Sequence, residues 1–491
     1  MSSCAIAGLV TGPAGASRRR LLGLVLLLAG LPAAARGQSG REVDRIDITG
    51  RQNLTLGSGA RAYGMGGAFL ARADDATAAS WNPAGLSYLR TPELSLVGAS
   101  TSIDLTRGPD SDHFEGRAID FAAFTWPVGI GEVRGAIQLS YQRAISFDGT
   151  RRIEIYDRTT GTLTQLEEGS SDGGFDVVAF GTGLRLSRHV RAGVTVNRWL
   201  NGYDQTLSRT LLKDTQRPLR VFDLDFRPSG WSFNLGVIVS PVEQLNLAAI
   251  YKTSFSADVR LDKARRDTWG TLTNVEEVTR NAHASEAVGL DFPSSFGFGV
   301  SWRPRDTLTL SADLTRTSWS EARILDYFDV LATGRSVDGV PSVPPPPIVY
   351  PELQYPSLRG VPDPDDPSDP LRLLGQQDAE QIRVGLEWVL IAGRLKVPLR
   401  VGYFNDRQII PNPTGDIPRF NGFTVGTGLI LGSMLLDVAY VREFGDYEVT
   451  EQTAGGGDFD VPPTTVTVSN SLTTNRFFAS IIYRFSGHWR P

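Results

Sequence analysis

The sequence predicts an all-β fold, namely a transmembrane antiparallel β-barrel of about 14 strands with an N-terminal plug segment. Three observations predict it. Strand-like runs alternate apolar residues with polar or small ones, and the links between the runs are alternately short and long. After the N-terminal leader, no stretch approaches the ~18–20 apolar residues of a membrane-spanning helix. A chain of this kind enters a membrane only as a closed barrel, because lipid offers no hydrogen-bond partner to an open strand edge.

The leader, residues 1–37, is predicted to be a cleaved signal peptide. Three arginines at 18–20 precede an apolar run at Leu21–Leu31, and small residues suited to cleavage follow at Ala33–Ala35. General secretion is favoured over twin-arginine export, since a barrel protein must cross the inner membrane unfolded. The only cysteine, Cys4, lies in the leader, so the mature chain has no disulfide and no thiolate ligand.

Residues 38–92 are predicted to form a periplasmic or luminal plug. Glycines allow the backbone to fold tightly in a narrow lumen, the acidic pair is suited to cap a helical turn at Ala76–Ser80, and an Asn-Pro step initiates a turn. A surface loop ahead of the first strand is the alternative. A dinucleotide site is excluded, because the third glycine and a strand–helix–strand unit are missing. The candidate plug or gate residues are Gly64, Gly66, Gly67, Asp74, Asp75, Asn82, Pro83 and Ala84.

Residues 93–485 carry the strand pattern of the barrel. For example, the apolar residues of Phe296–Trp302 alternate with glycine and serine. A soluble sandwich also alternates, but short links such as Ser187–His189 that take turns with long polar excursions are typical of an outer-membrane barrel. The predicted strands are 93–103, 118–127, 132–146, 174–186, 190–203, 231–240, 244–256, 292–303, 307–319, 380–391, 395–406, 421–432, 434–447 and 475–485.

Aromatic residues near strand ends predict an interfacial girdle, with scattered core aromatics as the alternative. The residues expected there are Trp126, Tyr141, Trp199, Tyr251, Trp302, Trp319, Tyr403 and Tyr440. The final strand has the alternating, aromatic-ended form that the outer-membrane assembly machinery recognises, and a tail, 486–491, follows it.

The longest excursion, 320–379, is rich in proline, which predicts an extended, solvated loop. Its aspartates at 363, 365, 366 and 369 could gather calcium, but a charge run in a loop is more often simply solvated. No metal and no cofactor is predicted.

The segment Leu56–Leu89, LGSGARAYGMGGAFLARADDATAASWNPAGLSYL, resembles the N-terminal plug of the FadL/OmpP1/TodX family of long-chain fatty acid and hydrocarbon transporters. Stretches at Leu290–Ala322, Leu399–Phe404 and Phe423–Tyr440 are similar to the family as well. The resemblance implies an outer-membrane location and a hydrophobic small-molecule ligand. It also implies a route in which the ligand enters among the outside loops, reaches a pocket over the plug and leaves sideways through a gap in the wall.

Two inward-facing arginines on neighbouring strands, Arg383 and Arg400, are candidate ligands for a fatty acid carboxylate. The alternative is that each pairs with Glu387 or Asp437 and holds the wall together. The expected partners of the chain are outer-membrane lipids, the hydrophobic ligand and the assembly machinery.

The sequence also bears on three other function classes. Catalysis is not expected, because His113 and His283 are placed in loops, His189 in a turn and His488 in the tail, and no Gly-x-Ser-x-Gly elbow occurs. A scaffold or shuttle in protein secretion and a diffusion porin both remain open. The formal net charge is −5, and lysine and arginine are spread along the whole chain. This distribution argues against a nucleic-acid partner.

Overall fold

A computed structural model describes residues 57–107, 110–130, 133–156, 160, 162–211, 219–268, 280–321, 377–393, 395–409, 412–453 and 464–485. The predicted signal peptide, the first part of the plug segment, most of the 320–379 loop with its aspartates, and the tail lie outside the described residues. The chain divides into two units, 1–38 and 39–491, and every described residue belongs to the second.

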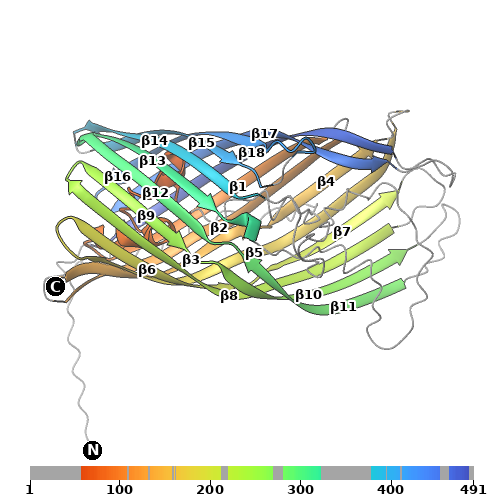
Figure 1. The fold of residues 1–491 in the computed structure, drawn as a ribbon, viewed down its shortest axis with the longest axis horizontal. Helices are drawn as coiled ribbons and strands as arrows, with labels where there is room; N and C mark the ends of the chain where they lie inside the picture. The colour runs from red at the N-terminus through yellow and green to blue at the C-terminus, as the bar shows by residue number, and fades with distance from the viewer. Residues whose placement is uncertain are drawn as a thin grey trace, which may run out of the picture. The chain divides into compact units, whose positions relative to one another are not determined.

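The wall of the barrel is a closed ring of 14 antiparallel strands in the described part of the chain (Figure 1). The ring closes where β1 (Glu93–Arg107) pairs with β18 (Thr464–Arg484). This arrangement confirms the predicted fold, and each predicted strand corresponds to one strand of the wall. The strands between β1 and β18 are β2 (Asp110–Ile130), β3 (Val133–Ser146), β5 (Leu163–Arg185), β6 (Val190–Leu200), β8 (Leu219–Val242), β9 (Leu245–Lys252), β12 (Ser295–Arg305), β13 (Leu308–Thr317), β14 (Ala379–Ala392), β15 (Leu395–Arg407), β16 (Arg419–Leu431) and β17 (Met434–Thr453).

Further strands extend the wall at the end away from the short turns. They are β4 (Gly149–Tyr156), β7 (Tyr203–Leu211), β10 (Phe255–Thr268) and β11 (Arg280–Phe292). Each continues a wall strand across a two-residue break; β10, for instance, follows β9 and pairs with β8 and β11. The stretch between the predicted strands 244–256 and 292–303 was expected to be a long polar excursion, but its described residues, 257–268 and 280–291, lie in β10 and β11. Their sequence shows no apolar face, because a strand beyond the lipid needs none.

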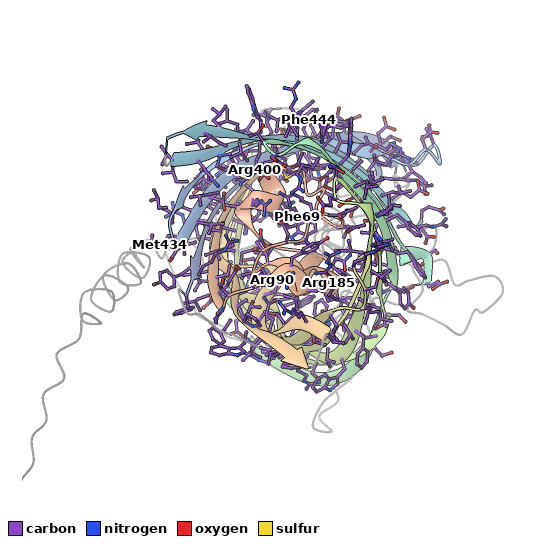
Figure 2. All side chains as sticks on the ribbon, turned by 90° about the vertical axis from the view of Figure 1, so that its left-hand side faces the viewer. Phe69, Arg90, Arg185, Arg400, Met434 and Phe444 are labelled. Carbon is purple, nitrogen blue, oxygen red and sulfur yellow. The ribbon has the colours of Figure 1, made fainter. Side chains whose placement is uncertain are left out.

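The outward face of the wall is apolar and the inward face is polar or small, which is the reverse of a soluble protein. Along β12, Phe296, Phe298 and Trp302 are exposed, whereas Ser295 and Ser301 are buried toward the lumen. Figure 2 shows the side chains arranged around this ring. The apolar band on the outside meets the requirement of a lipid environment.

The predicted aromatic girdle is correct for some residues and wrong for others. Trp126, Trp302 and Tyr440 are exposed on the outer face, as expected. Trp199 and Trp319, in contrast, are 8% and 0% exposed and lie on the luminal side. Trp199 points inward because side chains alternate between the two faces of a strand, and its position shares a face with the inward-facing residues of β6.

Residues 57–92 pack against the inner face of the wall, near the end that carries the short turns (Figure 1). They contain the short helices α3 (Ala60–Gly64) and α4 (Ala78–Trp81) and the 3₁₀ helix η2 (Pro83–Tyr88). The 3₁₀ helix η3 (Trp319–Glu321) follows β13. Among the described helices, none is both long and apolar enough to cross a membrane.

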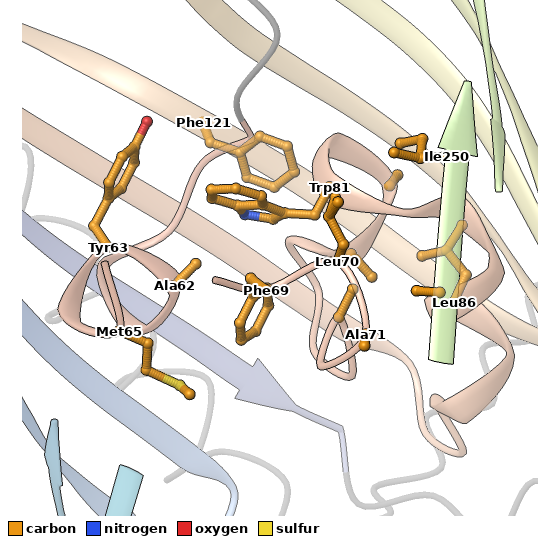
Figure 3. Packing of buried hydrophobic residues seen from close by; sticks show 14 of the residues in the cluster. Ala62, Tyr63, Met65, Phe69, Leu70, Ala71, Trp81, Leu86, Phe121 and Ile250 are labelled. Atoms are coloured by element: carbon orange, nitrogen blue, oxygen red, sulfur yellow. The ribbon is translucent and has the colours of Figure 1, made fainter. Parts of the chain in front are cut away.

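The core of the protein is shared between this luminal segment and the wall. Phe69 and Trp81 are buried and meet edge to face, with ring centroids 5.9 Å apart. Figure 3 shows them beside Phe121 of β2 and close to Leu86 and Ile250. Burying aromatic side chains of this size stabilises the segment in its place.

Candidate functional site

The luminal segment 57–92 is called the plug from here on. It contacts the wall at glycine positions, where no wall side chain lies between the two. On β14 and β15, a Cβ added to Gly385 would lie 2.2 Å from the carbonyl oxygen of Met65, and one added to Gly402 would lie 2.1 Å from the amide nitrogen of Gly66. Such distances leave no room for a side chain. Glycine is therefore required in the wall at this first contact, called seat A.

The predicted plug glycines all lie at seat A. Gly66 and Gly67 have φ values of 70° and 76°, in the left-handed region that favours glycine. A Cβ on Gly66 would also lie 2.8 Å from the carbonyl oxygen of Val384. Gly64 faces Gly426 of β16, so that backbone packs on backbone. The sequence predicted these glycines because they allow tight backbone turns. The structure adds that they contact the wall.

A second contact, called seat B, lies on β5, β6 and β8. A Cβ added to Gly193 would lie 2.3 Å from the carbonyl carbon of Pro83, and one added to Gly236 would lie 2.0 Å from Oδ1 of Asn82. Gly183 on β5 approaches Pro83 in the same way, at 2.3 Å. The Asn-Pro step therefore rests on a patch of wall that has no side chains.

Asn82 organises the plug at seat B. Its Oδ1 accepts a hydrogen bond from the amide of Ala84 at 3.1 Å, which caps the first turn of η2. Its Nδ2 donates to the carbonyl oxygens of Leu70 at 3.1 Å and Val237 at 3.3 Å. One side chain thus joins the turn, the rest of the plug and the wall strand β8.

A buried ion network joins the plug to the wall. Glu387 of β14 accepts from Arg61 at 3.1 Å, from Arg72 at 3.4 Å and from Arg400 at 2.8 Å. Arg400 also donates to Asp437 at 2.7 Å. The carboxylate of Glu387 is only 5% exposed, so three guanidinium groups, two of them from the plug, surround one buried anion.

The acidic pair of the plug has two different roles. Asp74 pairs with Arg61 at 2.7 Å and also contacts Arg72. Asp75 accepts from the amide of Thr77 at 2.9 Å and from its hydroxyl at 2.6 Å, in the turn that begins α4. Burial lowers the pKa of Arg61, but the surrounding carboxylates outweigh this effect and hold that pKa well above its ordinary value. Arg61 therefore stays charged.

The two candidate ligand-binding arginines both contact the plug or its ion network. Arg383 donates to the carbonyl oxygen of Gly66 at 3.0 Å and to Asp406 at 2.8 Å, and its guanidinium lies over the ring of Phe404. Arg400 pairs with Glu387 and Asp437, the two carboxylates named in the alternative interpretation. A role in holding a ligand carboxylate stays a prediction, and a ligand would have to compete with these ion pairs.

A pocket lies in the lumen beside the plug, and Ser80 of α4 forms part of its lining. Its cavity volume is about 60 Å³. Its aromatic side stacks in sequence: Trp199 on Phe255 with centroids 4.8 Å apart, and Phe255 on Phe292 at 4.7 Å. Its polar groups include Asn197, Asn234 and Lys252.

Sequence reasoning missed this pocket. It forms at the two strand breaks that separate β9 from β10 and β11 from β12, where Thr253 and Pro293 join the lining. The position of Trp199 in the alternation along its strand could have revealed the pocket, since it predicts a luminal side chain. The stacked partners Phe255 and Phe292 lie far apart in the sequence, and only the pairing of β10 with β11 brings them together.

No metal centre emerges from the described residues, in which no group of three His, Cys, Asp or Glu side chains could hold an ion. Two histidines expected in loops lie in strands instead: His113 in β2 and His283 in β11. His113 contacts Asp104 at 2.6 Å on the exposed part of the wall. His189 lies in the short turn between β5 and β6, as expected.

Residues 176–338 match the family model described as "Outer membrane protein transport protein (OMPP1/FadL/TodX)". The predicted resemblance to this family is confirmed. The match covers strands on both sides of the pocket, including β6, β9 and β12. Together, the OmpP1/FadL/TodX match and the barrel fold locate the protein in the outer membrane.

Solved structures of this family share the fold. A FadL homologue from Pseudomonas aeruginosa aligns with a TM-score of 0.54 at 13% identity, covering 87% of this chain and 98% of that one. The toluene transporter TbuX of Ralstonia pickettii aligns at 0.52 with 14% identity, covering 88% and 99%. The toluene transporter TodX of Pseudomonas putida aligns at 0.52 with 13% identity, covering 88% and 98%. Among curated proteins, no sequence matches.

Proposed function

We propose that this protein carries hydrophobic small molecules across the outer membrane by passive diffusion, with the aromatic pocket as a binding site and the plug as a gate. The pocket carries the proposal. It lies inside the lumen, its lining combines stacked aromatic rings with polar groups, and α4 of the plug borders it. The family match and the likeness in fold to two toluene transporters support the same substrate class.

The chemistry of the pocket favours a ligand with a long apolar part and one polar end. The stacked rings of Trp199, Phe255 and Phe292 offer apolar faces. The ammonium of Lys252, which donates to the carbonyl oxygen of Ser80 at 3.3 Å, and the amides of Asn197 and Asn234 offer polar contacts. A long-chain fatty acid has both parts, and it is the substrate we propose. A hydrocarbon would use the aromatic side alone.

The plug supports a gated route rather than an open diffusion pore. It contacts the wall at seat A and at seat B, which lie on different groups of strands, and the Glu387 network adds buried ion pairs. A ligand that leaves the pocket toward the periplasm must pass this segment or leave through the wall. The sideways exit implied by the family resemblance stays a prediction.

Ligand binding to the pocket is tested by oleate titration of the purified protein in detergent, followed by tryptophan fluorescence. The variant Phe255→Ala/Phe292→Ala removes the aromatic stack and is expected to weaken oleate binding by at least tenfold, because two stacked rings that line the pocket are lost. The control Phe298→Ala removes a ring that is 61% exposed on the outer face. Unchanged oleate affinity in the double variant would show that the pocket is not the binding site.

The polar end of the substrate is tested by comparing oleate with toluene. Lys252→Met retains an apolar stem and removes the ammonium, so oleate uptake by cells should fall while toluene uptake stays unchanged. Equal effects on both compounds would reject a fatty acid carboxylate at Lys252. Such a result would leave the broader proposal of hydrophobic transport in place.

A further inference from the structure

We propose that the barrel contains a binding site for a phosphate group at the end that carries the short turns. A second pocket lies at this end, between the plug and the ends of the wall strands β5, β6, β8, β9, β12 and β13. Its cavity volume is about 660 Å³. Figure 2 looks into the barrel from this end and shows Arg90 and Arg185 at the same side of the lumen.

The lining of this pocket, called the arginine mouth, is unusually rich in guanidinium groups. Arg188 lies in the turn between β5 and β6, Arg185 and Arg191 flank that turn, and Arg303 comes from β12. Arg72 also lines it, but that side chain already pairs with Asp74 and Glu387. The other arginines form no ion pair with a carboxylate among the described residues.

Their hydrogen bonds go to neutral acceptors instead. Arg185 donates to the carbonyl oxygen of Ser187 at 3.3 Å, and Arg191 donates to the hydroxyl of Ser240 at 3.1 Å. Arg303 donates to the backbone oxygen of Glu243 at 3.5 Å. The carboxylate of Glu243 is the only acidic group of the lining besides the paired Asp74, so positive charge clearly exceeds negative charge in the mouth.

Arg191 is the strongest indication of an anion site. It is 9% exposed, it lies 4.1 Å over the ring of Tyr88, and its Nε has no hydrogen-bond partner among the described residues. The hydroxyl of Tyr88, which also lines the pocket, lacks a partner too. A buried guanidinium without a counter-ion is costly, and an oxyanion with several acceptor oxygens would satisfy both groups.

Phosphate fits these donors better than a single carboxylate does. It offers more acceptor oxygens, it carries more negative charge, and guanidinium groups bind it in bidentate geometry. Leu186, beside the mouth, is 59% exposed and extends the apolar outer face to this end. Lipid headgroups of the periplasmic leaflet are therefore one source of the phosphate, and a free phosphate ion is the other.

The first test titrates inorganic phosphate into the intact protein in detergent, with binding followed by calorimetry. Arg188→Gln/Arg191→Gln is expected to weaken phosphate binding by at least tenfold, since it removes two charge-assisted donors. The matched control, Arg152→Gln/Arg419→Gln, removes the same charge from two exposed arginines at the far end of the wall, and its affinity should equal that of the wild type. Saturable binding that the mouth variant lacks and the control retains would support the site.

The second test distinguishes the two sources. The protein is placed in nanodiscs that contain phosphatidylglycerol or diacylglycerol, and lipids retained after gentle extraction are counted by native mass spectrometry. Retention of phosphatidylglycerol that depends on Arg188 and Arg191 assigns the site to a lipid headgroup. Binding of inorganic phosphate without retained lipid assigns it to the free ion.

Absence of both kinds of binding in the wild type would overturn the proposal, and so would equal binding in the mouth variant and the control. If the double variant fails to fold, as judged by gel mobility before and after boiling, Arg188→Gln is used alone. Arg188 is exposed in a turn, so its loss should not affect folding. Phosphate affinity unchanged by Arg188→Gln would then count against the site. None of these results depends on oleate or toluene binding.

Discussion

Gly66 of the plug and Gly402 of β15 approach so closely that neither has room for a side chain. A Cβ on Gly402 would lie 2.1 Å from the amide nitrogen of Gly66, and a Cβ on Gly66 would lie 3.0 Å from the amide nitrogen of Tyr403. Beside them, the hydroxyl of Thr424 accepts from the amide of Gly66 at 2.9 Å and donates to the carbonyl oxygen of Gly64 at 3.0 Å. The plug is thus held at seat A by backbone contact, by the hydroxyl of Thr424 and by the guanidinium of Arg383.

The first prediction is that Gly66→Val displaces the plug and leaves the barrel intact. The substitution puts a branched side chain at a φ of 70°, against wall backbone, while the ladder of the wall stays paired. Fatty acid uptake by cells that express normal amounts of the variant should be lost. Gly98→Ala is the control, because no atom lies within 4 Å of a Cβ added to Gly98. Normal uptake by Gly66→Val, by Asn82→Ala and by a variant that lacks residues 56–82 would reduce the plug to a passive leader.

The second prediction concerns Glu387→Gln. Removing this charge leaves Arg61, Arg72 and Arg400 with one carboxylate fewer, and losing one partner of a buried ion pair costs about 3–5 kcal/mol. Amide exchange of residues 60–88 should accelerate, and exchange in the strands should not. Glu380→Gln, which neutralises a carboxylate that is 38% exposed, serves as the comparison. Equal exchange rates in the two variants would mean that the network does not hold the plug.

A third prediction separates the two roles considered for Arg383 and Arg400. Since both side chains are buried in ion pairs with wall carboxylates, we expect Arg383→Ala and Arg400→Ala to loosen the plug and to leave the oleate affinity of the aromatic pocket within about threefold of wild type. The measurement combines oleate titration with proteolysis of the plug. Loss of oleate binding together with an intact plug would assign the arginines to the ligand carboxylate.

The fourth prediction is that chelators and reducing agents do not affect the folded barrel. The mature chain lacks cysteine after removal of the predicted leader, and the closed ring satisfies the edges of every wall strand. Protein treated with EDTA and dithiothreitol should migrate differently on gels before and after boiling, as untreated protein does. Identical mobility of folded samples before and after boiling would contradict the architecture.

Much of the wall was predictable from the sequence because period-two alternation is a local signal. The lipid requires apolar residues at outward positions, so the alternating pattern marks the membrane-spanning part of each strand in the sequence. The strands β10 and β11 lack this requirement, and their pattern gave no sign of them. Gly66, Gly67 and Asn82 were found from their backbone chemistry, which is also local.

The function of the inward glycines could not be predicted. The space beside Gly385 and Gly402 is filled by plug backbone, and the space beside Gly236 is filled by the side chains of Asn82 and Pro83. This fit depends on which part of the plug meets which strand, and that pairing links residues more than 150 positions apart. The partners of Arg72, Arg61 and Glu387 depend on the same placement, so the ion network had no local signal either.

The breaks between β3 and β4, β6 and β7, β9 and β10, and β11 and β12 have a consequence for how this barrel tolerates sequence change. In an uninterrupted strand, one inserted residue turns every later side chain to the opposite face. A break absorbs such an insertion, because the ladder is already interrupted there. The outer ends of these strands are therefore free to diverge in length and composition, while the lipid-facing band beneath them keeps its apolar side outward.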